Sequence, residues 1–147
     1  MPEEPPTTSP TTGAAEQTSA ERLNAAVALL TAPSLDPAGV KQARDLIDTT
    51  YGALYQQLAL DQADATAMGD LLEQRFEADR AALAAASAQG FNLVDNPLQV
   101  ARIAAPFVLP VENNLQTLLG PANYVQYQIY AAPIRAAVVG ALRQKQP

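Results

Sequence analysis

The chain has 147 residues, enough for one domain with a single core, and carries 15 acidic and 9 basic residues for a net charge of −6. No clustered basic face is visible, which disfavours nucleic acid and anionic membrane surfaces as partners. Because Cys and His are both absent, the usual zinc, iron–sulfur and haem sites, Ser-His-Asp catalysis and cysteine nucleophiles are excluded.

Residues 1–18 are mostly Pro, Thr, Ser, Glu and Gly, so few of them can enter a core. We expect an acidic, disordered tail there and a helical domain over residues 19–145. The longest apolar stretch, residues 103–111, is about half of what a membrane span needs. The first residues lack the basic and then apolar pattern of an export signal. We therefore expect a cytoplasmic protein, or a periplasmic or envelope protein from which the signal was removed.

Leu, Ile, Val and Tyr recur at spacings of three and four, which predicts amphipathic helices. A first helix should begin with a capping box at Thr18 and Glu21 and stop before Pro33. A second should begin at Asp36 and Pro37, as N-cap and first-turn proline. Its polar face should carry two ion pairs at a spacing of four, Lys41–Asp45 and Arg44–Asp48.

The longest unbroken helical pattern runs from about residue 62 to residue 88, with Asp61 as its N-cap. At 1.5 Å per residue this helix would be about 40 Å long, so we expect it to be the spine of the fold. Beyond it, Pro106, Pro110 and Pro133 should kink or divide the helices, and one segment should end at Gly120. The predicted fold is thus all-α, with five or six helices, a long central helix in a hairpin or bundle, and proline-kinked C-terminal helices.

All five tyrosines fall into two groups at helical spacing. The first group is Tyr51 and Tyr55, and the second is Tyr124, Tyr127 and Tyr130. One interpretation is an aromatic face that binds a peptide or a partner helix. The other, simpler interpretation is that the rings pack inward and leave their hydroxyls at the rim.

Four charged residues adjoin otherwise apolar segments: Arg75, Asp79, Glu112 and Arg135. Since a guanidinium pairs well with carboxylates, we interpret them as candidate ion pairs between neighbouring helices, with surface exposure as the alternative. Other acids line the long helix, namely Asp70, Glu73 and Glu77. Paired carboxylates can act as acid and base, but a solvated helix face has the same pattern. We predict no catalytic residue, metal or cofactor.

Several short segments carry a resemblance to a known group of proteins: Leu58-Ala59-Leu60-Asp61-Gln62, Leu71-Leu72-Glu73-Gln74-Arg75, Leu118-Leu119-Gly120-Pro121, the three tyrosines that follow, and Arg135. Over about residues 50–143 the chain resembles helical bacterial envelope proteins of the Spy/CpxP group, which carry LTXXQ motifs. At that motif, however, this chain reads Leu60-Asp61-Gln62-Ala63-Asp64 and lacks both the Thr and the final Gln.

The resemblance implies a periplasmic protein that binds clients on a helical surface, as chaperones or stress-signalling modulators do. Together with the missing catalytic residue types and the tyrosine groups, it predicts a non-enzymatic binding module of the envelope. The partner would be a protein or peptide, with the tyrosines among the contact residues. The alternative is a structural subunit or an obligate oligomer, in which apolar stripes such as residues 103–109 are buried by a second copy.

Overall fold

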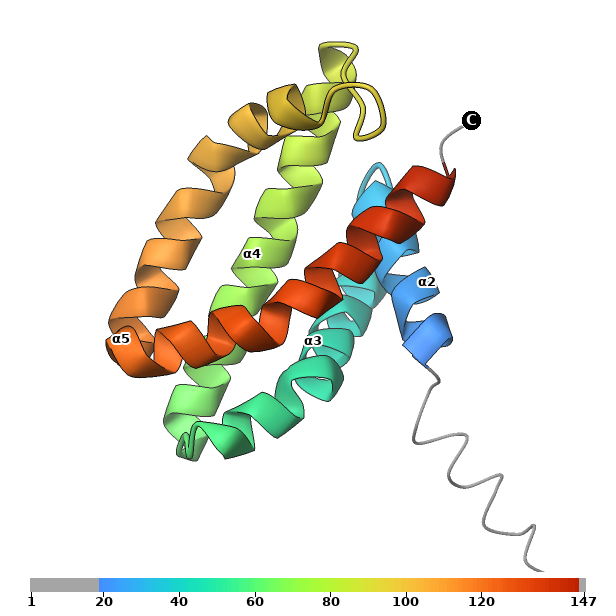
Figure 1. The fold of residues 1–147 in the computed structure, drawn as a ribbon. Coiled ribbons are helices and arrows are strands. Elements are labelled where there is room, and N and C mark those ends of the chain that lie inside the picture. The colour runs from blue at the N-terminus through green and yellow to red at the C-terminus, as the bar shows by residue number, and fades with distance from the viewer. Residues whose placement is uncertain (1–18, 146–147) are drawn as a thin grey trace, which may run out of the picture.

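In the computed structural model, residues 19–145 are described, and four helices account for most of them. They are α2 (Ser19–Thr31), α3 (Pro37–Gln57), α4 (Gln62–Ala88) and α5 (Pro97–Lys145) (Figure 1). No strand occurs within this range, which confirms the all-helical class. The expected tail, including Thr18 of the capping box, lies outside the described residues.

The starts of α3 and α4 are fixed by aspartate caps, as the sequence predicts. Asp36 accepts a hydrogen bond from the backbone N–H of Gly39 at 2.7 Å, and Pro37 occupies the first turn. Asp61 accepts one from the backbone N–H of Asp64 at 2.8 Å. Each carboxylate thereby satisfies an N–H group that has no partner inside its helix.

The prediction of five or six helices with proline kinks is not confirmed. Pro106, Pro110 and Pro133 lie inside α5, and the backbone departs from helical geometry at Gly120 instead, with φ 80° and ψ 165°. Such a conformation is open almost only to glycine, because a Cβ atom would clash with the backbone. Gly120 therefore divides α5 into a first part, residues 97–119, and a last part, residues 121–145.

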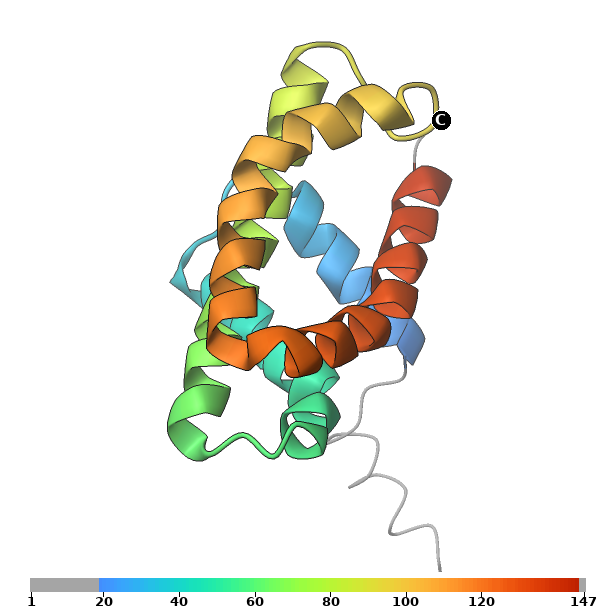
Figure 2. The same ribbon diagram turned by 60° about the vertical axis from the view of Figure 1, so that its left-hand side comes forward.

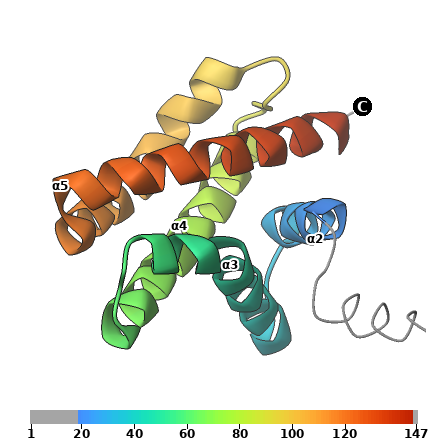
Figure 3. The same ribbon diagram turned by 60° about the horizontal axis from the view of Figure 1, so that its bottom comes forward.

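The long helix α4 is the centre of the arrangement, as predicted. The first part of α5 returns beside α4 as a helical hairpin, and the last part then crosses the face of the molecule toward α2 (Figures 1 and 2). Seen from below, α3 and α2 lie on one side of this crossing segment (Figure 3). The last part of α5 thus lies across the other helices, and together with them it lines a cavity.

The core lies where α3, α4 and α5 meet, and its most deeply buried side chains are Leu54, Met68, Leu115 and Tyr127. Each fully buried Leu or Met contributes about 1.5–3 kcal/mol. Three alanines on α4, at positions 78, 82 and 86, are buried, and their small side chains project little from this face of the helix. Of these three, Ala82 lines the space bounded by the last part of α5, where its small side chain leaves room.

The end of α2 is fixed to α4 by Arg80. Its Nε donates to the carbonyl oxygen of Leu29 at 3.0 Å, and its Nη2 donates to that of Ala32 at 2.8 Å. Carbonyl groups at a helix C-terminus lack partners inside the helix, and a guanidinium satisfies them well. This contact holds the end of α2 against α4.

Candidate binding cavity

A cavity of about 320 Å³ lies among all four helices. Most of its lining is aliphatic, with Leu30 from α2, Ile47 from α3, Leu83 from α4, and Val100 and Leu142 from the two parts of α5. Its polar lining consists of five side chains: Thr50, Tyr51, Arg75, Asp79 and Arg135. We call these five residues the polar end of the cavity.

Glu112, on the first part of α5, organises the side chains behind the polar end. Its carboxylate accepts hydrogen bonds from Arg75 Nη1 at 2.5 Å, the Tyr124 hydroxyl at 2.7 Å and the Tyr127 hydroxyl at 3.0 Å. Arg135 Nη2 lies 3.4 Å from the same carboxylate and also donates to the Tyr127 hydroxyl. One carboxylate therefore ties α4 to both parts of α5.

The network shifts the pKa values of its members. Burial alone would raise the pKa of Glu112, but the Tyr124 hydrogen bond and the charges of Arg75 and Arg135 outweigh it, so this pKa is lowered. Burial together with the bond to Glu112 raises the pKa of Tyr124 to about 12. Glu112 is therefore ionised and Tyr124 protonated at neutral pH.

The pKa of Asp79 shifts in the opposite direction to that of Glu112. Burial raises its pKa, and the nearby positive charge of Arg75, whose Nε donates to it at 3.3 Å, only partly compensates. Two carboxylates with pKa values moved apart can form an acid–base pair. Here, however, only Asp79 lines the cavity, while Glu112 is occupied by four donors. The pair therefore offers a ligand one carboxylate, not two.

The structure brings all four predicted ion-pair residues into this one network. Arg75 contacts both Asp79 and Glu112, and Arg135 contacts Glu112. Arg75 and Glu112 are mostly shielded from solvent, with side chains 17% and 13% exposed. A cation and an anion at such a site stabilise each other, whereas either one alone would be costly to bury.

The two tyrosine groups of the sequence become largely one cluster. The Tyr51 ring lies 6.4 Å from that of Tyr127 and 5.6 Å from that of Tyr130, and Tyr124 lies 5.7 Å from Tyr127. Tyr51 and Tyr127 are buried, and the others are half-buried. Tyr55 stands apart and donates to Asp48 at 3.2 Å. Most of the rings therefore pack inward.

The hydroxyl of Tyr51 is distinct from the other four. Tyr55, Tyr124 and Tyr127 donate to carboxylates, and Tyr130 donates to the carbonyl oxygen of Thr50 at 2.7 Å. Tyr51 is only 9% exposed, yet its hydroxyl has no hydrogen-bond partner among residues 19–145. A buried hydroxyl normally has a partner, so this one has a donor and acceptor to spare beside the cavity.

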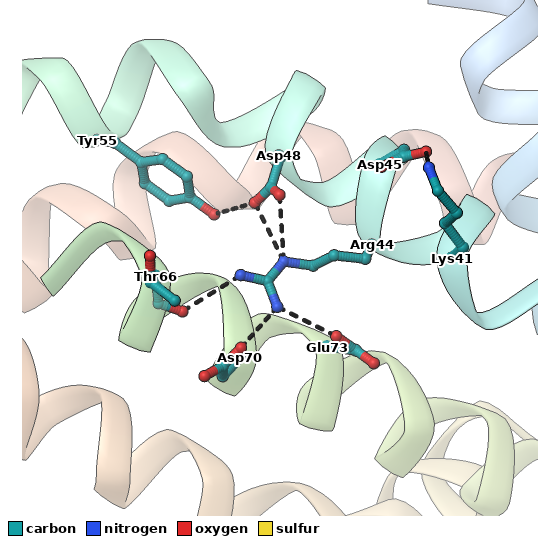
Figure 4. A network of polar contacts seen from close by, with 8 residues as sticks. All are labelled: Lys41, Arg44, Asp45, Asp48, Tyr55, Thr66, Asp70 and Glu73. Atoms are coloured by element: carbon teal, nitrogen blue, oxygen red, sulfur yellow. Dashed lines mark hydrogen bonds and ion pairs between the residues drawn. The ribbon is translucent and has the colours of Figure 1, made fainter. Parts of the chain in front are cut away.

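A second polar network lies outside the cavity and joins α3 to α4 (Figure 4). Arg44 contacts Asp48 on its own helix at 3.2 Å, and Asp70 and Glu73 on α4 at 2.6 and 3.2 Å. It also donates to the carbonyl oxygen of Thr66 at 3.3 Å. The predicted Arg44–Asp48 pair is thus confirmed, as is Lys41–Asp45 at 2.9 Å. Asp70 and Glu73 belong to this clamp, which is structural.

Several large apolar side chains remain on the surface. The most exposed are Leu98 at 69%, Ile129 at 63% and Leu109 at 57%, all on α5. Val125 precedes Ile129 by four residues, so the two share one helix face.

Among the described helices, none has the length and apolar character needed to cross a membrane. The described residues also contain no group of three acids that could hold a metal.

The cavity itself was not predicted from the sequence. Its polar residues stood out as charges and tyrosines, but its apolar walls are ordinary helix residues such as Ala43 and Val138. They become a cavity only when the last part of α5 crosses the other helices. Comparison of the chain with models of protein families, with curated proteins and with solved structures found no significant match.

Proposed function

We propose that this chain is a non-enzymatic binding module that takes an apolar group of its partner into the cavity among α2, α3, α4 and α5. The observation that supports this most directly is the cavity's aliphatic lining, contributed by every helix. Its volume of about 320 Å³ is at the lower end of the range for ligand pockets. An apolar group placed there would leave water, which is the main favourable contribution to such binding.

The residue types support binding more than catalysis. His and Cys are absent from the sequence, and the cavity offers one carboxylate, Asp79, held by Arg75. A general acid–base reaction needs two groups in reach of the substrate with suitable pKa values. The polar end instead supplies hydrogen-bond donors, which suit recognition.

An apolar fluorescent dye would test the proposal. Neutral phenylnaphthylamine should bind the protein and brighten as it leaves water. The substitution Ala104→Leu, at the cavity wall, should weaken dye binding about tenfold or more by filling the space. Ala101→Leu, one turn earlier on α5 and exposed, is the matched control and should leave binding unchanged.

Overpacking can destabilise a protein, so both variants need an unfolding curve beside the binding measurement. A second filling variant, Ala26→Leu, approaches the cavity from α2 and gives an independent result. If the folded wild-type protein fails to bind the dye, the proposal is wrong. It is also wrong if both filling variants fold and bind as the wild type does.

The setting proposed from the sequence resemblance is the bacterial envelope, with a chaperone-like or stress-sensing role toward a protein or peptide partner. In that role the cavity and the exposed apolar residues of α5 would receive apolar side chains of a client. A holdase assay would test this by measuring suppression of client aggregation, with cell fractionation to locate the protein. No suppression, together with a cytoplasmic location, would remove this part of the proposal.

A second candidate function is that of a structural subunit or obligate oligomer. The observation in its favour is the exposed pair Val125 and Ile129, which a second copy could cover. Exposed apolar patches of this kind often mark interfaces between proteins. Sedimentation at micromolar concentration tests it, because a monomer that persists over a wide concentration range would exclude self-association as the role.

A further inference from the structure

We infer that the cavity binds an aliphatic carboxylate, whose head group hydrogen-bonds to the Tyr51 hydroxyl and the Arg135 guanidinium while its hydrocarbon chain occupies the apolar part. This inference rests on the proposed function and names the ligand class for the same site. It depends on three observations: the unpartnered hydroxyl of Tyr51, the unused donors of Arg75 and Arg135 in the same cavity lining, and the separation of polar from apolar lining.

The hydroxyl of Tyr51 is the first observation. It is buried, it lines the cavity, and it has no hydrogen bond within the described residues. Burial is also the main reason that the pKa of Tyr51 is raised, so the hydroxyl keeps its proton and can donate. A ligand acceptor placed here would supply the bond that the fold does not.

The unused donors are the second observation. Arg135 forms both of its polar contacts through Nη2, which leaves Nε and Nη1 without a partner in the described chain. Arg75 uses Nε and Nη1 and leaves Nη2. Against these donors, the polar end provides a single anion, Asp79, which already binds Arg75. Asp79 and Glu112 together balance the charges of Arg75 and Arg135, so it is the unused N–H donors of the two guanidiniums that select a head group able to accept hydrogen bonds, for which a carboxylate is well suited.

The third observation is the separation of the apolar lining residues from the polar ones. Beyond Arg135, the last part of α5 contributes Val138, Val139 and Leu142, which extend for about two helical turns, roughly 10 Å. Leu83 of α4 and Val100 of the first part of α5 lie in the same apolar lining.

This lining selects a hydrocarbon chain over the backbone of a peptide. The backbone amides of a peptide would have no partners against these aliphatic walls, and unpaired buried amides are costly. An unbroken alkyl chain has no such groups. The occupant that best matches both ends is therefore an alkyl chain that carries one carboxylate, as in a fatty acid.

Calorimetric titration with three ligands of equal chain length tests the head group: dodecanoate, dodecanol and dodecylamine. Wild-type protein should bind dodecanoate about tenfold or more tightly than dodecanol, and dodecylamine least tightly. Tyr51→Phe and Arg135→Gln should each remove most of this preference while dodecanol binding stays the same. Each ligand is used below the concentration at which it forms micelles.

Matched controls separate the head-group contacts from general damage. Tyr130→Phe removes a hydroxyl that bonds to the Thr50 carbonyl and does not line the cavity. Arg143→Gln removes an exposed positive charge from the same part of α5. Both should keep the preference for dodecanoate. A loss of preference in these controls equal to that in the test variants would overturn the assignment of Tyr51 and Arg135.

The outcomes distinguish this inference from the function on which it rests. Equal binding of dodecanoate and dodecanol would overturn the inference and leave the apolar binding module in place. Absence of binding by all three would overturn both. Tighter binding of dodecylamine would identify Asp79 as the head-group partner and overturn the anionic assignment. Tighter binding of a short peptide with an apolar C-terminal residue and a free carboxylate would overturn the hydrocarbon chain.

Discussion

The guanidinium of Arg44 lies against Gly69 so closely that a Cβ atom at position 69 would stand 2.5 Å from its Nη2. The missing side chain gives Arg44 room to lie over α4 and contact Asp70, Glu73 and the Thr66 carbonyl (Figure 4). A glycine inside a helix is otherwise unfavourable, because it loses more conformational entropy on folding than alanine does. Gly69 is therefore explained by the clamp between α3 and α4.

The substitution Gly69→Ala should lower the free energy of unfolding by about 0.5–1.5 kcal/mol, because the displaced Arg44 loses contacts worth more than the gain in helix propensity. Gly52→Ala is the control. Nothing lies within 4 Å of a Cβ atom there, so this change should raise stability by about 0.5–1 kcal/mol. Urea unfolding measures both, and a stabilised Gly69→Ala variant would contradict the role given to this close approach.

Removal of the charge of Glu112 should be more damaging. Glu112→Gln keeps the size of the side chain but leaves Arg135 and one contact of Arg75 without a carboxylate at a site that is 13% exposed. We expect a loss of about 2–4 kcal/mol in the free energy of unfolding. Glu77→Gln, at the exposed pair with Arg80, should cost about 0–0.5 kcal/mol. Similar losses in the two variants would mean that the Glu112 network contributes little.

The pH dependence of stability should carry two opposite contributions. The pKa of Glu112 is lowered from 4.5 in the folded state, so its stabilisation is present above about pH 4.5 and is lost as the pH falls through the lowered value. The pKa of Asp79 is raised from 3.8, so its contribution is present below about pH 3.8 and is lost as the pH rises through the raised value.

Unfolding curves measured over about pH 3–7 for two variants separate these contributions. Glu112→Gln should show a smaller loss of stability on acidification than the wild type. Asp79→Asn should show a larger one, because it lacks the group that favours the folded state in acid. If the two variants respond to acid in the same way, the opposite signs given to these carboxylates are wrong.

Any side chain at position 120 should lower the free energy of unfolding. The φ of 80° with ψ of 165° at Gly120 lies in a region open almost only to glycine, and beyond the adjacent backbone no atom lies within 4 Å of a Cβ atom placed there. Gly120→Ala should therefore lower the free energy of unfolding by about 1–3 kcal/mol through backbone strain alone. Gly140→Ala, also in open space but inside the helix, should be neutral or stabilising. A neutral Gly120→Ala would contradict the strained geometry.

Local rules predicted much of this fold from the sequence. Asp36 and Asp61 cap the helices that they were expected to cap, because capping depends only on the next three residues. The prolines at 106, 110 and 133 did not divide α5, since the neighbouring packing can hold a helix across a proline whose local cost is a few kcal/mol. The break falls at Gly120, where the sequence also predicted the end of a helical segment.

The candidate site was harder to predict, because it depends on contacts between distant segments. Spacing could pair Arg75 with Asp79 on one helix, but it could not place Glu112 and Arg135 against the same guanidinium. Nor could it show that Tyr51 is the tyrosine whose hydroxyl is unpartnered. Periodicity shows which face of a helix is apolar. It does not show whether that face packs against a neighbouring helix or lines a cavity.

The crossing of the last part of α5 toward α2 has a consequence for biosynthesis. A chain that emerges from the ribosome makes α2, α3 and α4 well before Leu142, yet Leu142 completes a wall of the cavity. Contacts so far apart in sequence form late in folding. A nascent chain therefore exposes the apolar faces of its earlier helices until the last wall is synthesised, and any product that stops before Leu142 lacks the complete site.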